Sequence, residues 1–374
     1  MDCAFFGKKI GGESDGWHSS SAIDRVGTAT DAEDQAMSTN RLIKHIGGGV
    51  EAEITLIDHP NHGVVILKTR KDTSQISNEA NVALTLIQGD QSSRNTLCQV
   101  FSIEGPASDM IIEYCDGGDL RYVINQLHVQ SYCLGKAFLR HVQLHLGAAL
   151  VYLHCGIHFD VAVGDYKYPS LHGPPWNRIS HRDIKPDNIF LRWTNKVDSS
   201  CLFPDIILGD FGNAITERNF DSVLRDHGRR IEAPMRRNFC GQNYGPPEFF
   251  LLEGGDDIEN VSVLSSFDMW QFGATLYELV TRIVLNMVLQ NQDRNPDKTR
   301  KWISKEDWGE ISAEVINMIK ENRTERVTDE MLVKILPIWK TRRNEEFDKE
   351  DGVGRRDVGW LRENTQRIDM LRMK

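Results

Sequence analysis

The stretch ISHRDIKPDNIFL at residues 179–191 constrains the fold more than any other part of this sequence. It places Asp183, Lys185 and Asn188 on a tight loop between a helical pattern and a short apolar run predicted to be a strand. Phosphoryl transfer needs these groups, because a carboxylate orients the attacking hydroxyl and accepts its proton, a lysine offsets charge on the moving phosphate, and a carboxamide holds metal. A polar turn is the alternative, but His-Arg-Asp followed by Lys and Asn at fixed offsets is more specific than a turn requires.

A second acidic group follows in IILGDFGNA, where Asp210 comes after an apolar run and before a flexible glycine. A carboxylate in this place can bind Mg²⁺ that bridges phosphate oxygens. Asp-Phe-Gly alone is a common turn, but Asp210 lies 27 residues after Asp183 (210 minus 183), and the pair favours phosphotransfer. We therefore expect Asn188 and Asp210 to be the metal ligands.

Two further groups lie upstream of the loop. Lys68 ends the apolar run VVILK and can reach phosphates if an acidic side chain on the neighbouring helix holds its ammonium, for which Glu79 is the candidate. Without the later motifs, an ordinary strand-end lysine and a solvated glutamate would be favoured. Gly47 and Gly49 in HIGGGVEAEI allow close backbone approach to phosphate. A flexible turn is the alternative, but the position one hairpin before Lys68 favours a phosphate cover.

The length, composition and charge of the chain argue against several other classes of protein. The chain has 374 residues, enough for one large bilobal domain or two ordinary ones, and 40% hydrophobic residues, enough for a sizeable core. A formal net charge of −10 argues against nucleic acid as the main partner. No apolar run suggests a membrane span or a signal peptide, and seven cysteines without a C-x-x-C pair indicate reduced thiols. We expect a cytoplasmic and/or nuclear protein of unknown oligomeric state.

The apolar pattern changes along the chain. Short runs separated by glycine between residues 41 and 70, with a turn at HPNHG, predict antiparallel strands. A helical pattern follows, with Ile76, Ala80, Ala83, Leu84 and Ile87 on one face. After CDGGDL, long helical patterns dominate. The sequence therefore predicts an α+β bilobal, protein-kinase-like fold with a β-rich N-lobe and a mainly helical C-lobe.

The predicted boundaries follow from these changes in pattern. They are a flexible extension at 1–39, a catalytic domain at 40–340 and a charged C-terminal tail at 341–374. Within the domain we expect the N-lobe at 40–112, a hinge at 113–118, the C-lobe at 119–340 and an insertion at 157–178 that is rich in Pro, Gly and aromatic residues.

These motifs occur over about 300 residues in an order that resembles the eukaryotic protein kinases. The resemblance implies that Ile112 guards the back of an adenine pocket, that Glu113 and Cys115 present hinge backbone to adenine, and that Asp119 faces the ribose. The nucleotide-binding set that it implies is Ile46, Gly47, Gly49, Ile54, Lys68, Ile112, Glu113, Cys115, Asp119 and Asp210. ATP and Mg²⁺ are the implied cofactors.

The resemblance also bears on substrate and architecture. Lys185 is similar to the serine/threonine pattern rather than the tyrosine-kinase pattern, which implies transfer to serine and threonine hydroxyl groups of protein substrates. Pro246, Pro247 and Glu248 look like the Ala-Pro-Glu that closes the activation segment, and Arg326 matches the arginine that pairs with that glutamate. Asp268, Trp270 and Gly273 resemble the helix whose aspartate caps the backbone of the catalytic loop.

Several positions depart from the family pattern. Ala52 replaces the third glycine of the phosphate cover, Ile54 replaces a valine, and Ile66 adds bulk near the expected adenine. Lys68 and Glu79 are only 11 residues apart (79 minus 68), which shortens the strand-to-helix connection.

The activation segment departs further. It lacks the threonine that in the family contacts the catalytic aspartate, since Gly241, Gln242 and Asn243 occupy that region before Tyr244. Between residues 210 and 248 the only hydroxyl side chains are those of Thr216, Ser222 and Tyr244, so we expect activation without the usual phosphorylation of this segment, although Arg182 in such kinases often binds a phosphate there.

A pseudokinase that acts as an interaction module is the main alternative, because the altered segment and adenine pocket can block turnover. The five polar catalytic positions, Asp183, Lys185, Asn188, Lys68 and Glu79, are all of competent type and argue against it. A small-molecule phosphotransferase is a second alternative, but such enzymes lack the Pro-Pro-Glu closure and the Asp-x-Trp-x-x-Gly helix.

Overall fold

A computed structural model describes most of the catalytic region. The described residues are 40–48, 52–71, 78–88, 95–104, 109–169, 175–196, 198–219, 243–247, 261–287, 310–349 and 352–372. The predicted extension at 1–39 and Gly49, Glu248 and the stretch 220–242 lie outside them. None of the described helices has the length and apolar character needed to cross a membrane.

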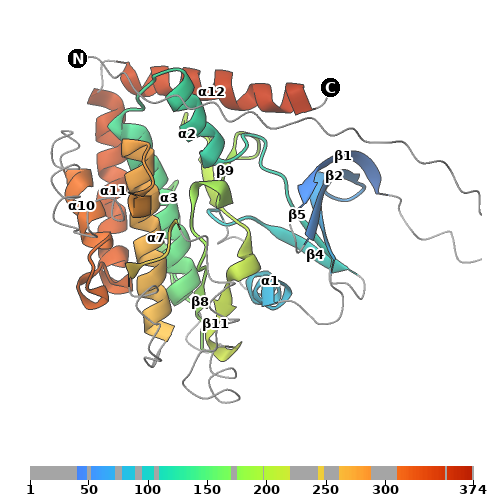
Figure 1. Ribbon diagram of the computed structural model, residues 1–374, viewed down its shortest axis with the longest axis horizontal. Coiled ribbons are helices and arrows are strands. Elements are labelled where there is room, and N and C mark those ends of the chain that lie inside the picture. Colours follow the sequence, from blue (N-terminus) through green and yellow to red (C-terminus); the bar gives the residue numbers. More distant parts are fainter. Residues whose placement is uncertain are drawn as a thin grey trace, which may run out of the picture. The chain divides into compact units, whose positions relative to one another are not determined.

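A five-stranded antiparallel sheet forms the N-terminal part (Figure 1). Its order is β1-β2-β3-β5-β4, and a turn after His59 joins β2 to β3, as the HPNHG stretch predicts. Ile57, Val65 and Ile111 form a buried cluster on this sheet. The strands are β1 (Arg41–Gly48), β2 (Ala52–His59), β3 (Gly63–Arg70), β4 (Val100–Glu104) and β5 (Asp109–Glu113).

Helix α1 (Asn78–Gln88) accompanies the sheet and confirms the helical prediction, although its buried face differs from the predicted one. Ala80 and Ala83 are buried as expected, but Leu84 is exposed, and Val82 and Leu86 are buried instead. The predicted face was wrong at Leu84 because the inner side of α1 is set by its contacts with the sheet and with the Asp210 turn, which a spacing pattern does not contain.

The C-terminal part is mainly helical, and its core lies along α3, whose residues 137–154 are all buried. Helix α11 packs against α3 at Gly147, where an added Cβ would lie 2.8 Å from Trp339. Glycine thus allows close contact between the two helices. The helices are α2 (Leu120–Val129), α3 (Lys136–Cys155), α7 (Val261–Thr281), α10 (Glu310–Met318), α11 (Asp329–Lys349) and α12 (Val353–Arg372).

Short strands and 3₁₀ turns lie between the helices in the sequence of the C-terminal part. They are β6 (His158–Phe159), β7 (Tyr166–Lys167), β8 (Ile179–Ser180), β9 (Ile189–Arg192), β10 (Asp205–Leu208) and β11 (Ile215–Thr216), with 3₁₀ turns η2 (Pro186–Asn188), η3 (Phe211–Asn213) and η5 (Arg323–Glu325). Antiparallel pairs β9–β10 and β8–β11 bracket the catalytic loop and the Asp210 turn.

Backbone hydrogen bonds join the two parts. The amide of Cys98 donates to Leu208 O at 2.8 Å, and the amide of Gly117 in the predicted hinge donates to Leu191 O at 2.8 Å. These bonds connect the β-rich lobe to the helical lobe, one at β10 and the other at β9. The arrangement confirms the predicted α+β bilobal fold.

The domain boundaries remain predictions, but the packing bears on two of them. In the 157–178 insertion, β6 and β7 form a hairpin, and Trp176 Nε1 donates to Leu153 O at 3.0 Å. The predicted limit at 340 falls inside α11, and Thr365 on α12 accepts from the buried Trp193 indole at 2.8 Å. The described part of 341–374 is thus helix that packs on the C-lobe.

Candidate active site

The catalytic loop brings together the three polar groups predicted from the 179–191 motif. Lys185 Nζ donates to Asp183 Oδ2 at 2.8 Å, and Asn188 Nδ2 donates to the same oxygen at 3.1 Å and to Asp183 O at 2.8 Å. The short turn η2, which starts at Pro186, carries Asn188 back toward Asp183. A proline suits this first position of a turn because its missing N–H is not needed there.

Asp183 is buried, and its two carboxylate oxygens differ in their hydrogen bonding. Oδ2 accepts hydrogen bonds, whereas Oδ1 has no partner among the residues that the structure describes. An unpaired buried carboxylate oxygen is costly, so its presence at this point favours a role in receiving a donor from outside the chain. A substrate hydroxyl is such a donor.

The His181 ring helps to fix the catalytic loop through both of its nitrogens. Its Nε2 lies 3.0 Å from Gly209 O, and its Nδ1 accepts from the Asp183 amide at 3.3 Å. Burial lowers the pKa of His181, which keeps the ring neutral and suits one donating and one accepting nitrogen. The ring thus links the catalytic loop to the residue that precedes Asp210.

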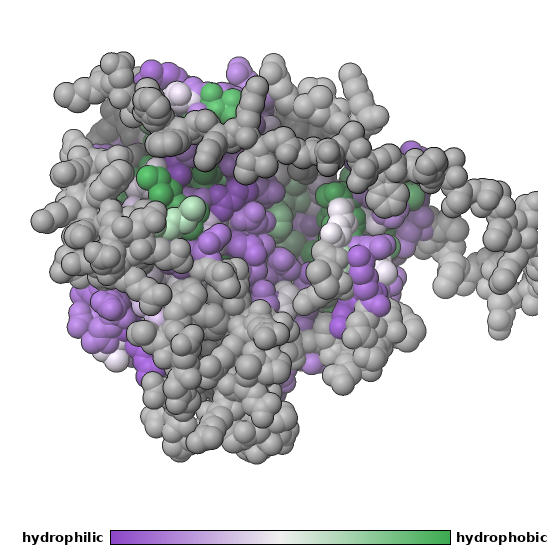
Figure 2. Space-filling model, viewed as in Figure 1, coloured by the Kyte–Doolittle hydropathy of each residue, from purple (hydrophilic) through white to green (hydrophobic). Residues whose placement is uncertain are grey.

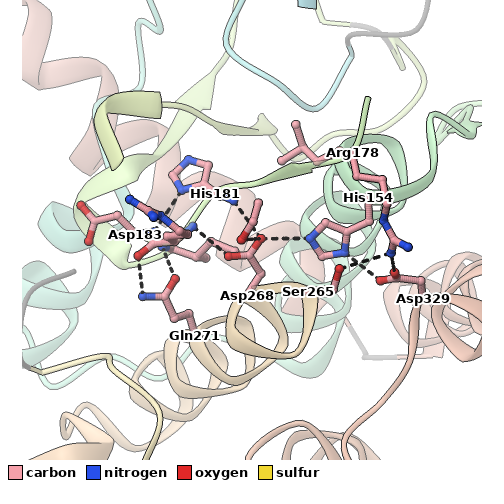
Figure 3. A network of polar contacts seen from close by, with 12 residues as sticks. His154, Arg178, His181, Asp183, Ser265, Asp268, Gln271 and Asp329 are labelled. Atoms are coloured by element: carbon pink, nitrogen blue, oxygen red, sulfur yellow. Dashed lines mark hydrogen bonds and ion pairs between the residues drawn. The ribbon is translucent and has the colours of Figure 1, made fainter. Parts of the chain in front are cut away.

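Helix α7 organises the loop backbone from the other side (Figure 3). Asp268 accepts from the amides of His181 and Arg182, each at 2.8 Å. Gln271 accepts from the Ile184 amide at 2.9 Å and donates to Arg182 O at 3.1 Å. The predicted capping role of Asp268 is therefore observed. Gln271, which is not one of the predicted motif positions, holds the loop through two further hydrogen bonds.

Asp268 also belongs to a buried charge network at the foot of the loop (Figure 3). His154 Nε2 lies 2.9 Å from Asp268, and its Nδ1 lies 2.7 Å from Asp329, which also binds Arg178 at 2.5 Å. Burial alone would lower the pKa of His154, but the carboxylates of Asp329 and Asp268 raise it to about 9. His154 is therefore an imidazolium that donates from both nitrogens at neutral pH.

This network predicts a loss of stability at alkaline pH. The folded pKa of His154, about 9, lies above the unfolded value of roughly 6.5, so its contribution is fully present below pH 6.5 and is lost as pH rises through 9. Between pH 6.5 and 9.5 we expect the free energy of unfolding to fall by about 3 kcal/mol more in the wild type than in a His154→Phe variant. Urea unfolding at both pH values measures this.

The matched control is His128→Phe, which changes a histidine at an exposed position. It should keep the wild-type pH dependence, and an unchanged dependence in His154→Phe as well would contradict the charged state of His154.

Lys68 connects the sheet to the Asp210 turn. Its Nζ lies 2.6 Å from Glu79 Oε1 and 2.9 Å from Asp210 Oδ1, so the predicted Lys68–Glu79 pair forms despite its short spacing. Burial opposes charge on Lys68, but Glu79 and Asp210 together raise its pKa. Desolvation by the surrounding protein likewise opposes charge on the partly exposed Asp210, yet the Lys68 ammonium lowers its pKa, and both groups are charged.

The donor set fits a divalent metal beside a phosphate. Asn188 turns its amide nitrogen toward Asp183, and its Oδ1 takes no hydrogen bond from the described chain. Asp210 binds Lys68 through Oδ1, and its carboxylate is 44% exposed. Carboxylate and carboxamide oxygens are the ligands that Mg²⁺ prefers, and phosphates usually complete its shell. Asn188 and Asp210 would hold the metal, and Lys68 would hold phosphates.

Several residues predicted to surround the nucleotide form cross-strand pairs on adjacent strands of the sheet. Gly47 pairs with Ile54, Ile54 with Lys68, and Ile66 with Ile112. An added Cβ at Gly47 would meet no atom within 4 Å, so the backbone there is open to a ligand. In Figure 2, hydrophilic residues form the visible surface at the centre of the molecule, and hydrophobic residues lie on both sides of them.

The hinge positions are shaped by contacts that the sequence did not reveal. Glu113 accepts from Arg192 at 2.6 Å, and Arg192 also binds Asp205 at 2.8 Å, which ties the end of β5 to β9 and β10. Cys115 is buried, and Asp119 caps α2 by accepting from the Tyr122 amide at 2.7 Å. Adenine and ribose contacts at these positions, and at Ile46 on β1, remain predictions.

Comparisons with known proteins agree with this geometry. The protein kinase domain family matches residues 170–335. Serine/threonine-protein kinase Nek1 of Toxoplasma gondii is 27% identical over 262 residues, which are 67% of this chain and 14% of that protein. Serine/threonine-protein kinase ATG1b of Arabidopsis thaliana is 25% identical over 64% of this chain and 27% of its own length. G2-specific protein kinase nimA of Emericella nidulans is 30% identical over 46% and 22%.

A β-rich lobe, a helical lobe and a catalytic loop beside a lysine-bound aspartate define the protein-kinase fold class. The family match and these relatives support a relationship of this chain to the eukaryotic protein kinases of the serine/threonine type. This family in general uses ATP and a divalent metal and acts on proteins. The chain spans between about a seventh and about a quarter of the length of the three relatives named.

Proposed function

We propose that this protein transfers the γ-phosphate of Mg-ATP to serine and threonine hydroxyl groups of protein substrates. The observation that carries the proposal is the asymmetry of Asp183, whose Oδ2 is held by protein donors while its buried Oδ1 has no partner within the described residues. A general base needs an oxygen of this kind within reach of the attacking hydroxyl.

Each residue of the site has a distinct part in the proposed reaction. Asp183 Oδ1 accepts the proton of the substrate hydroxyl, and Lys185, 2.8 Å from Oδ2, offsets negative charge near the transferred group. Lys68, held by Glu79, positions phosphates. When bound, Mg-ATP supplies the activated phosphoryl group, and Asn188 and Asp210 are the residues suited to its metal.

Serine/threonine preference rests on two supports. Lys185 follows the serine/threonine pattern of the catalytic loop, and two of the three relatives named above, those of Toxoplasma gondii and Arabidopsis thaliana, carry that specificity in their names. A pseudokinase remains the second candidate, because Ile66 lies directly across from Ile112 and adds bulk at the expected adenine site.

Removing the metal is the direct test of this proposal. Purified protein is incubated with labelled ATP, Mg²⁺ and generic protein substrates, and the labelled amino acids are identified after hydrolysis. We expect phosphoserine and phosphothreonine, and loss of labelling to background when EDTA removes Mg²⁺. A Glu53→Gln variant, which alters an exposed ion pair with Lys71 at 3.9 Å, is the control and should label normally. No labelling by folded protein that still binds ATP would favour the pseudokinase.

A further inference from the structure

We propose that Asn213 is a positioning residue that holds the catalytic aspartate, in place of the activation-segment threonine that the chain lacks. Asn213 Nδ2 donates to Asp183 Oδ2 at 3.2 Å. Its place directly after Asp-Phe-Gly is far in sequence from residues 241–243, where that threonine would stand. The inference rests on the proposed kinase activity, because it concerns the orientation of the proposed base.

Both the backbone and the side chain of Asn213 are fixed. Arg182 Nε donates to Asn213 O at 2.5 Å, and the turn η3 closes as the Ala214 amide donates to Phe211 O at 3.0 Å. The next residue, Ile215, pairs with Ser180 in the β8–β11 ladder. Asn213 is thus held between the Asp210 turn and the strand that leads into the catalytic loop, so its amide reaches Asp183 from a rigid support.

Three donors converge on one oxygen of Asp183. Lys185, Asn188 and Asn213 all donate to Oδ2, at 2.8, 3.1 and 3.2 Å. A carboxylate with one oxygen bound from several directions cannot rotate without breaking these bonds, and the other oxygen stays free. An amide suits the third position because it donates without adding charge beside Lys185. Aspartate would place a second carboxylate against Asp183.

Arg182 contacts the same asparagine as the catalytic aspartate does. Related loops use such an arginine to bind an activation-segment phosphate, whereas here its guanidinium binds the Asn213 carbonyl. Residues 223–243 contain no hydroxyl side chain. Arg182 therefore contacts the backbone carbonyl of Asn213, and Asp183 contacts the side chain of Asn213. These contacts hold the loop with residues that are present in the unmodified chain.

The test compares wild type, Asn213→Ala and the isosteric Asn213→Asp. We expect kcat to fall about tenfold in Asn213→Ala and further in Asn213→Asp, with KM for ATP within about twofold of wild type. A merely space-filling role would leave Asn213→Asp nearly as active as wild type. Asn61→Ala, in the exposed turn after β2, is the control and should keep the wild-type kcat. Equal kcat in wild type and Asn213→Ala would overturn the inference.

A crystal structure of each variant separates this inference from the proposed function. If wild type labels no substrate, the proposed activity fails, and the orientation of Asp183 still decides the role of Asn213. Rotation of the Asp183 carboxylate in Asn213→Ala supports the inference, and an unchanged orientation contradicts it.

Discussion

The Asp183→Asn variant is expected to lose phosphotransfer by about 10³-fold in kcat while it still binds ATP. An asparagine has nearly the shape of aspartate, so it keeps an acceptor for Lys185 and Asn188, which lie 2.8 and 3.1 Å from Oδ2. It cannot accept the proton of the attacking hydroxyl at the position of Oδ1. The nucleotide groups Lys68, Glu79 and Asp210 do not contact Oδ1, so we expect ATP affinity to change by less than about threefold.

Single-turnover labelling and a separate ATP-binding titration measure the two quantities. Asp187→Asn is the matched control, because Asp187 lies in the same loop but is 48% exposed and contacts Arg121 at the surface. It should retain wild-type kcat within about twofold. Full activity in Asp183→Asn would remove Asp183 from the role of base, and lost ATP binding would indicate a structural defect instead.

Local motifs were sufficient to predict which polar side chains meet at the catalytic loop. Asp183, Lys185 and Asn188 lie within six residues of one another, so a tight loop must bring them together whatever the rest of the fold does. The Lys68–Glu79 pair was also predictable, because a strand followed by a helix leaves few acidic partners for a strand-end lysine. Its distance of 2.6 Å shows that the short connection does not prevent contact.

Residues whose partners are distant in sequence were not predictable. His154 looks like one more residue of a helical run, and its charge depends on Asp268 and Asp329, which lie 114 and 175 residues away. Arg192 likewise finds Glu113, 79 residues away. A single sequence does not show which buried charges meet. The desolvation penalty of each charge is offset only after the fold brings opposite charges together.

Asn213 is an intermediate case. It follows Asp-Phe-Gly directly, so its position near the site was predictable, but asparagine is common in turns and its side-chain direction depends on the turn η3. The absence of a threonine near Tyr244 was the available signal that another residue must hold Asp183. Leu84 shows that a local pattern can also mislead. Helical spacing predicted that Leu84 faces inward, but the structure exposes it.

The Asp268→Ala variant is expected to be destabilised by about 3–5 kcal/mol, the cost typical of removing one partner from a buried ion pair. Asp268 is fully buried, and its removal leaves His154 charged with only Asp329 beside it. It also leaves the amides of His181 and Arg182 without the carboxylate that accepts from both at 2.8 Å. For a domain of this size, such a loss lowers the melting temperature by roughly 10 °C.

Thermal and urea unfolding of Asp268→Ala, His154→Leu and the double variant separate the two causes. If the uncompensated imidazolium dominates, the double variant is less destabilised than the sum of the single variants, because no buried charge remains unpaired. If the two lost amide contacts dominate, the effects of the two substitutions add. Asp187→Ala, which removes an exposed carboxylate, should change stability by less than about 1 kcal/mol. An Asp268→Ala variant as stable as this control would show that α7 does not hold the catalytic loop through Asp268.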